Sequence, residues 1–180
     1  QVFDVLKNVQ DKQKGCLGIL FRLVNLYVVY GREQLQDNPA RLGLLVEMAE
    51  NALNAKPKQV YKESCNSDGA VVLQLLLYNF PGFMDNFLEK ILSDTLIRYT
   101  QGVDNGFLKV RLLGVVEAAF TNNVVLTMQI LSRSTNSQGI SFLRYALLEI
   151  IQNSYLVVHS YDKRVAVYGL CELIAQQNLP

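Results

Sequence analysis

The side chains that could do chemistry are few in this sequence, and they stand far apart. His159 is the single histidine, so a histidine-paired nucleophile or a multi-histidine metal site has only this residue to draw on. The three cysteines are Cys16, Cys65 and Cys171. The spacings Cys-x-x-Cys, His-Glu-x-x-His and Gly-x-x-x-x-Gly-Lys-Ser/Thr do not occur, which leaves structural zinc, zincin and phosphate-loop chemistry without their required patterns. We therefore expect no enzyme, and no catalytic, cofactor or metal site.

The histidine and the cysteines have structural interpretations. His159 falls at the junction between two expected helices, where a histidine at a helix end or in a loop is ordinary. The cysteines are odd in number and no Asn-x-Ser/Thr sequon occurs, which favours a reducing compartment over a secreted disulfide framework. We expect the three thiols to be buried in the core.

The charged residues indicate a solvated surface. One face of the segment 83–99 carries Asp85, Glu89, Lys90, Asp94 and Arg98, an arrangement typical of a wet helix face with i, i+4 pairs. The basic groupings are modest, Lys109 with Arg111 and Lys163 with Arg164, and we expect each to be a solvated helix start or the lining of a groove. With 17 Lys and Arg against 16 Asp and Glu, the net charge of +1 gives no basic face for direct nucleic-acid binding.

The elements that must position these residues are helices. Apolar residues recur with a 3.6-residue period and almost no segment alternates with period two, so the sequence predicts an all-α fold. The expected helices are 16–30, 40–54, 70–78, 83–99, 106–120, 123–131, 138–158 and 163–176. Asn38 and Pro39 are expected to cap and begin the second of them. Asn66–Gly69 leads into the third, and Asn122–Asn123 separates the fifth from the sixth.

Several residues have an expected place in the packing. The inward faces of 83–99 and 138–158 are expected to carry Phe83, Met84, Phe87, Leu88, Ile91, Leu92, Leu96, Tyr99, Phe142, Leu143, Leu147, Leu148, Ile151, Tyr155 and Leu156. Gly114 and Gly169 interrupt strong helical patterns, where glycine costs about 1 kcal/mol relative to alanine, so each is expected to permit close approach of a neighbouring helix. The longest apolar stretch, 16–30, is interrupted by Arg22 and Asn25 and is shorter than the roughly 20 residues that a bilayer requires. No membrane span is expected.

The spacing of the helices predicts a repeat architecture. The helix starts near Ser67 and Gly106 are 39 residues apart, close to the HEAT-type period of roughly 40–47. We expect residues 1–180 to form one stack of three to four antiparallel helix pairs, a HEAT-type α-solenoid. Apolar residues make up 50% of the chain and charged residues only 18%, against roughly 25% charged in ordinary soluble domains. The shortage of charge favours an internal or C-terminal fragment of a larger solenoid, whose end faces neighbouring repeats would cover.

The stretch from Gln152 to Pro180 resembles a known family. Its turn reads His159-Ser-Tyr-Asp-Lys-Arg164, and the helix after it reads Val167-Tyr-Gly-Leu-Cys-Glu-Leu-Ile174. This resembles the C-terminal part of the importin-β (karyopherin) superfamily, in particular the branch of importins seven and eight, although two residues are added after His159. The exportin branch that recycles importin-α is next closest. The resemblance extends weakly upstream, through Leu23–Val28 and 83–132, and only the last 30 residues are specific.

The resemblance implies a nuclear transport receptor. Such a protein carries protein cargo through the nuclear pore, binds Phe-Gly nucleoporins on its outer surface and is controlled by Ran-GTP, and it works in the cytoplasm, the nucleus and the pore. The main Ran-binding element of the family is N-terminal and the acidic loops of this branch have no counterpart here, so no partner-binding residue is transferred. The alternative is a HEAT-repeat scaffold or adaptor unrelated to transport, of the phosphatase-scaffold or coat-adaptor type.

Overall fold

The described part of the chain is helical. The structure, a computed structural model, describes residues 5–6, 8–9, 17–54, 62–136 and 138–176. It contains eight α-helices and one 3-10 helix: α2 (Leu17–Tyr30), α3 (Arg32–Gln36), α4 (Pro39–Leu53), α5 (Lys62–Asn79), α6 (Asp85–Thr100), α7 (Gly106–Arg133), α8 (Phe142–Asn153), η2 (Ser154–Leu156) and α9 (Ser160–Ala175). Within these ranges no β-sheet forms, and the single β-bridge joins Thr135 to Ser141. The predicted all-α class is confirmed.

Short polar side chains set several helix starts. The side chain of Asn38 accepts a hydrogen bond from the backbone N–H of Ala40, and Pro39 occupies the first position of α4, as the sequence predicts. Asn105 caps α7 in the same way, by accepting from the backbone N–H of Phe107 at 2.9 Å. These caps satisfy backbone donors that a helix start leaves without an internal partner.

Helix α7 reverses direction at Asn123. The backbone of Asn123, with φ −158° and ψ 93°, is extended rather than helical. The Thr127 hydroxyl donates to the carbonyl oxygen of Ala119 at 2.9 Å, although a straight helix would separate these residues by about 12 Å along its axis. The two parts of α7, 106–122 and 124–133, therefore form a tight antiparallel pair, as predicted from Asn122–Asn123.

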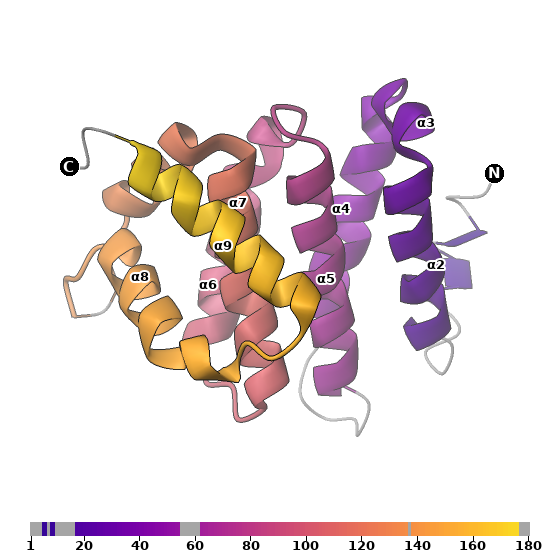
Figure 1. Cartoon of the computed structure of the whole chain (residues 1–180). Helices are drawn as coiled ribbons and strands as arrows, with labels where there is room; N and C mark the ends of the chain where they lie inside the picture. The colour runs from indigo at the N-terminus through magenta and orange to yellow at the C-terminus, as the bar shows by residue number, and fades with distance from the viewer. Residues whose placement is uncertain (1–4, 7, 10–16, 55–61, 137, 177–180) are drawn as a thin grey trace.

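The helices are arranged in two layers. Figure 1 shows α2, α5 and the first part of α7 side by side, with α4 and α6 behind them. Helix α5 contacts α2, α4 and α7, and α6 contacts α4 and α7. Helix α9 lies diagonally across α7, and α8 lies at the end of the molecule opposite α2. The last two helices do not stack one after the other as an antiparallel pair would. Helix α8 meets α6 through Tyr99 and Tyr145, whereas α9 packs on the first part of α7.

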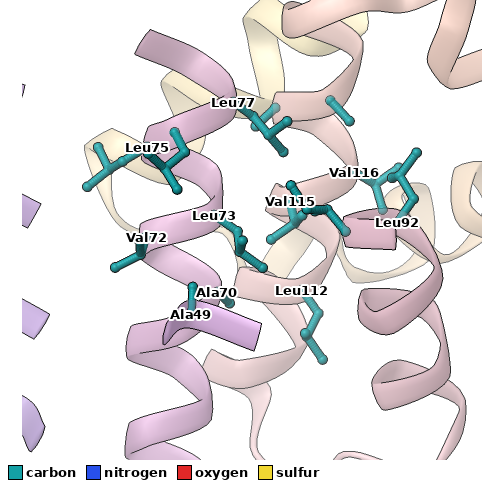
Figure 2. Close-up of a cluster of buried hydrophobic side chains, with 14 of the residues drawn as sticks. Ala49, Ala70, Val72, Leu73, Leu75, Leu77, Leu92, Leu112, Val115 and Val116 are labelled. Atoms are coloured by element: carbon teal, nitrogen blue, oxygen red, sulfur yellow. The ribbon is translucent and has the colours of Figure 1, made fainter. Parts of the chain in front are cut away.

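The core runs between the layers. Figure 2 shows buried side chains converging from α4, α5, α6 and α7, among them Ala49, Leu73, Leu92, Leu112 and Val115. The second half of α5, 70–78, and the first part of α7 are apolar on most of their surface because neighbouring helices cover them on several sides. They are the most enclosed elements of the fold.

Some helix boundaries differ from the sequence predictions. Helix α5 begins at Lys62, so Asn66–Gly69 lies inside it, and Gly69 packs against α4, where an added Cβ would lie 2.7 Å from the carbonyl oxygen of Ala49. Helices α5 and α7 therefore begin 44 residues apart. The short helix α3 was not expected, and the expected helix 138–158 is shorter, ending at Asn153 before η2.

Four expected core residues are exposed. Phe83 precedes α6 in a turn and is 47% exposed, while Leu148, Ile151 and Tyr155 are 43%, 69% and 76% exposed. Leu148 and Ile151 are exposed because α8 is covered on one side only, where Ala146 and Ile150 are buried, and its other apolar side meets no other helix of the described structure. Tyr155 lies in η2, which has no buried residue.

Helix α7 also has the length and apolar composition of a membrane span, alone among the described helices. Its apolar window is 67% buried inside the protein. The reversal at Asn123 further divides the helix into parts of 17 and 10 residues, each shorter than the roughly 20 residues needed to cross a bilayer. Its place in the core accounts for its apolar sequence.

Candidate functional site

The residues that could do chemistry remain apart in the fold. His159 is the N-cap residue of α9, and its exposed ring stacks on that of Phe107, with 5.7 Å between ring centroids. Cys171 is exposed, which corrects the expectation that it is buried, because it lies on the face of α9 that points away from α7. Cys16 and the side chain of Cys65 lie outside the described residues. Among the side chains that are described, no group of three or more His, Cys, Asp or Glu is placed to hold a metal ion.

The carboxylates of α6 are partly structural. Asp85 accepts hydrogen bonds from the side-chain amides of Asn122 and Asn123 at 3.0 and 2.9 Å, so it holds the reversal of α7 rather than facing water alone. Lys90 pairs with Asp94 at 3.5 Å, the expected i, i+4 contact. Lys90 also bonds the buried Glu50 of α4, a contact between helices that the sequence did not suggest.

The basic groupings divide in the structure. Lys163 and Arg164 are exposed in the first turns of α9, as expected. Arg111 is largely buried and is committed to an ion pair, because its Nη1 lies 2.6 Å from Oδ1 of Asp162, with side-chain exposures of 18% and 6%. Arg111 is thus part of the α7–α9 interface.

A second carboxyl lies buried in the same interface. Glu117 is 5% exposed, and burial, reinforced by the nearby charge of Asp162, raises the pKa of Glu117 to about 7. Burial also raises the pKa of Asp162, while Arg111 and His159 oppose that rise. Tyr161 is largely enclosed beside them, its hydroxyl finds no hydrogen-bond partner among the described residues, and burial raises its pKa too. The polar groups of this interface are therefore only partly satisfied.

Both singled-out glycines lie at close helix contacts, as predicted. An added Cβ on Gly169 would overlap the carbonyl oxygen of Glu117 and lie 2.8 Å from its carbonyl carbon. An added Cβ on Gly114 would lie 2.5 Å from Nε2 of Gln74, a buried amide that donates to the carbonyl oxygen of Arg111 at 2.6 Å. The two glycines allow α9 to approach α7 and α5 to approach α7.

A small groove opens between α6, the second part of α7 and α8. Its lining is mostly apolar, with the polar side chains of Glu89, Ser93 and Ser134 among it. The apolar lining residues are Leu92, Leu96, Ile97, Ile130, Leu131 and Phe142. Its volume of about 130 Å³ is well below the roughly 300–1,000 Å³ of small-molecule sites, so it suits a single inserted side chain.

Two apolar faces are left uncovered at opposite ends of the molecule. On α2, Ile19, Leu23, Leu26, Val29 and Tyr30 are exposed, with Tyr30 at 82%. At the other end Leu148, Ile151 and Tyr155 are exposed on α8 and η2. Val158, Val167, Tyr168 and Ile174 are also exposed, on the link after η2 and on α9, which lies across α7. Large exposed apolar faces mark interaction surfaces in soluble proteins.

The sequence reasoning missed the buried polar residues of the interior. Gln74 and Glu117 each stand in an apolar run, Val-Val-Leu-Gln-Leu-Leu-Leu and Leu-Leu-Gly-Val-Val-Glu-Ala-Ala-Phe. The signal for both is a polar residue at a core position of a helix. Such a residue must either form a hydrogen bond or, if it is ionisable, have a shifted pKa. The partner of Arg111, Asp162, is 51 residues away in sequence, and no local pattern connects the two.

Comparison of the chain with known protein families, with curated proteins and with solved structures finds no match.

Proposed function

We propose that this chain is a segment of a HEAT-type α-solenoid in a nuclear transport receptor, which carries protein cargo through the nuclear pore under Ran-GTP control and performs no catalysis. The observation that supports this most is the pair of exposed apolar faces at opposite ends of the molecule, on α2 at one end and on α8 at the other. In a solenoid each repeat packs only on its neighbours, so a segment buries its middle and leaves both ends apolar.

The pairing of helices also supports a repeat architecture. Helix α6 follows α5 through a short turn at Pro81-Gly82, and the two parts of α7 form an antiparallel pair around Asn123. The starts of α5 and α7 are 44 residues apart, within the roughly 40–47 of HEAT-type repeats.

The stretch that resembles importins has a defined place in this fold. His159 precedes α9, and Val167–Ile174 lies within α9. The glycine of this stretch, Gly169, is the residue that lies against the backbone of Glu117. A glycine is therefore required there by packing.

The groove between α6, α7 and α8 is the proposed contact for a Phe-Gly nucleoporin. An extended peptide could insert one aromatic ring between Leu96, Ile97 and Ile130 while its backbone meets Ser93 and Ser134. Ran-GTP and cargo would bind elsewhere on the receptor and be coupled through different affinities for its superhelical shapes. The receptor would work in the cytoplasm, in the nucleus and at the pore.

Capture of the native parent protein on immobilised Ran tests the transport function. Cell extract is passed over Ran loaded with GTP or with GDP, and the bound parent is detected with an antibody against this chain. Capture on the GTP form alone supports a transport receptor. Equal capture or none would refute it and would leave a scaffold or adaptor of another process.

Binding of a labelled Phe-Gly peptide tests the groove. Ile97→Glu places a charge at the half-exposed rim of the groove and is expected to weaken binding at least tenfold. Val125→Glu, at a similarly exposed site on α7 outside the groove, is the matched control and should bind as the unmodified chain does. Equal binding by both variants, or no loss when the peptide phenylalanines are replaced by serine, would remove the groove from the proposal.

A further inference from the structure

The groove between α6, the second part of α7 and α8 has a single charged residue in its lining. Six of its nine lining residues are apolar, two are Ser93 and Ser134, and the remaining one is Glu89, which is exposed on α6. The apolar lining favours an uncharged side chain inside the groove, because a charged group would lose its hydration there. A charge on a bound segment therefore stays outside the groove, where it can meet Glu89.

Glu89 has no cation beside it in the part of the chain that the structure describes. The side chains three and four positions away on α6, where a helical ion pair would form, carry no positive charge; they are Asp85, Asn86, Leu92 and Ser93. Lys90, the next residue, is bonded to Glu50 and Asp94 instead. No ion pair between described residues includes Glu89. Its charge is therefore available to a partner.

Glu89 marks one end of the groove. Helix α6 and the second part of α7 begin side by side, because Asp85 binds the two asparagines at the reversal of α7. Leu96 and Ile130 line the groove further along these two helices, which therefore run in the same direction. Glu89 precedes Leu96 by seven residues, which is about 10 Å along a helix axis.

An extended peptide can join the two ends of the groove. Its residues advance about 3.3 Å each, and side chains two residues apart point to the same side. With an aromatic ring held between Leu96, Ile97 and Ile130, the side chain two residues along begins about 7 Å nearer to Glu89. The flexible stem of a lysine or an arginine spans the few ångströms that remain.

We propose that the groove selects an extended segment in which a lysine or arginine stands two residues from the inserted aromatic residue. This inference rests on the proposed insertion of an aromatic ring, and it adds the charge that the partner must carry. The net charge of the chain, +1, would by itself slightly favour an acidic segment. Preference for a cation is therefore a local property of Glu89.

Binding of three labelled peptides to the complete chain, measured by fluorescence anisotropy, tests this selection. Each peptide has one phenylalanine among glycines and serines, and the residues two before and two after it are both lysine, both serine or both glutamate. One of the two can then reach Glu89 in either chain direction. The lysine peptide should bind about threefold more tightly than the serine peptide, and the glutamate peptide about threefold more weakly, as expected for an exposed ion pair. Added salt should reduce both differences.

Reversal of the charge on α6 separates Glu89 from other causes. Glu89→Lys should invert the order of the three peptides. Glu172→Lys, the same change at an exposed site on α9 outside the groove, should leave the order as it is in the unmodified chain.

The outcomes distinguish the charge selection from the aromatic contact on which it rests. Equal binding of the three peptides, or the same order in Glu89→Lys, would overturn the charge selection and leave the aromatic contact standing. Undiminished binding of the lysine peptide after its phenylalanine is replaced by serine would overturn both, because charge alone would then explain the binding. Absence of binding by every peptide would also overturn both.

Discussion

Replacement of Gly169 by alanine should separate α9 from α7. In a helix interior this change alone gains roughly 0.5–1 kcal/mol, because alanine loses less backbone freedom on folding. Here the new methyl group would overlap the carbonyl oxygen of Glu117 and lie 2.8 and 3.0 Å from its carbonyl and α carbons. Because these are backbone atoms of the enclosed helix α7, they cannot turn aside as a flexible side chain can.

The size of the effect follows from overpacking. Forcing an extra methyl group into a filled contact typically costs about 1–3 kcal/mol, and a clash with rigid backbone belongs at the upper end. After subtraction of the gain in helix propensity, the free energy of unfolding should fall by about 2 kcal/mol. The exchange protection of α9 should fall with it.

Two other glycines give matched controls. An alanine Cβ at Gly43 of α4 would meet only the Phe87 ring, at 3.5 Å, an ordinary contact, so Gly43→Ala should stabilise the chain by about 0.5–1 kcal/mol. Gly114→Ala would meet the Gln74 amide at 2.5 Å, and Gln74→Ala should relieve part of its cost in the double variant.

Urea unfolding followed by circular dichroism measures the whole series. The predicted order of stability is Gly43→Ala, then the unmodified chain, then Gly114→Ala, then Gly169→Ala. A Gly169→Ala chain as stable as the unmodified one would refute the close α7–α9 contact and, with it, the reason for a glycine at this position.

Three further predictions concern single contacts. Asp85→Ala leaves the buried amide of Asn122 without its acceptor and should lower the free energy of unfolding by about 1–3 kcal/mol in the same urea assay. No change in stability would mean that the reversal of α7 does not depend on this contact. Arg111→Met leaves Asp162 buried and unpaired, so it should lower the free energy of unfolding by about 2 kcal/mol near neutral pH and by less in acid, where Asp162 is protonated. The double variant Arg111→Met/Asp162→Leu should have a free energy of unfolding within about 1 kcal/mol of that of the unmodified chain. A double variant as unstable as the single one would contradict this account. Cys171 should react with a thiol reagent in the folded chain at a rate close to that of an unfolded peptide, and protection until unfolding would show that another surface covers this face of α9.

The parts of the fold that could be predicted are those with a local signal. Asn38-Pro39 and Asn122-Asn123 mark chain reversals because their side chains bond nearby backbone N–H groups. Gly114 and Gly169 indicate close contacts because glycine in a helix is unfavourable without such a reason. Helix α3 has no comparable signal, since its five residues include one apolar side chain, Leu35.

The parts that could not be predicted depend on which helices become neighbours. The apolar period of α8 identifies its faces and predicts a buried Ile151. It does not say that one face meets no other helix of the described structure, and Ile151 is exposed there. The sequence likewise shows a glutamate among apolar residues at Glu117. Its burial beside Asp162 arises only when α9 lies across α7.

The reversal of α7 has a consequence for chemical ageing. Its geometry depends on two side-chain amides, Asn122 and Asn123, that both donate to the carboxylate of Asp85. Hydrolysis of either amide, the slow deamidation of asparagine, would replace an N–H donor by a carboxylate about 3 Å from that of Asp85, and the attraction would become repulsion. The turn would then open and the second part of α7 would lose its place against α6. In stored preparations, loss of structure at this turn would therefore accompany a mass increase of about 1 Da in the peptide that contains it.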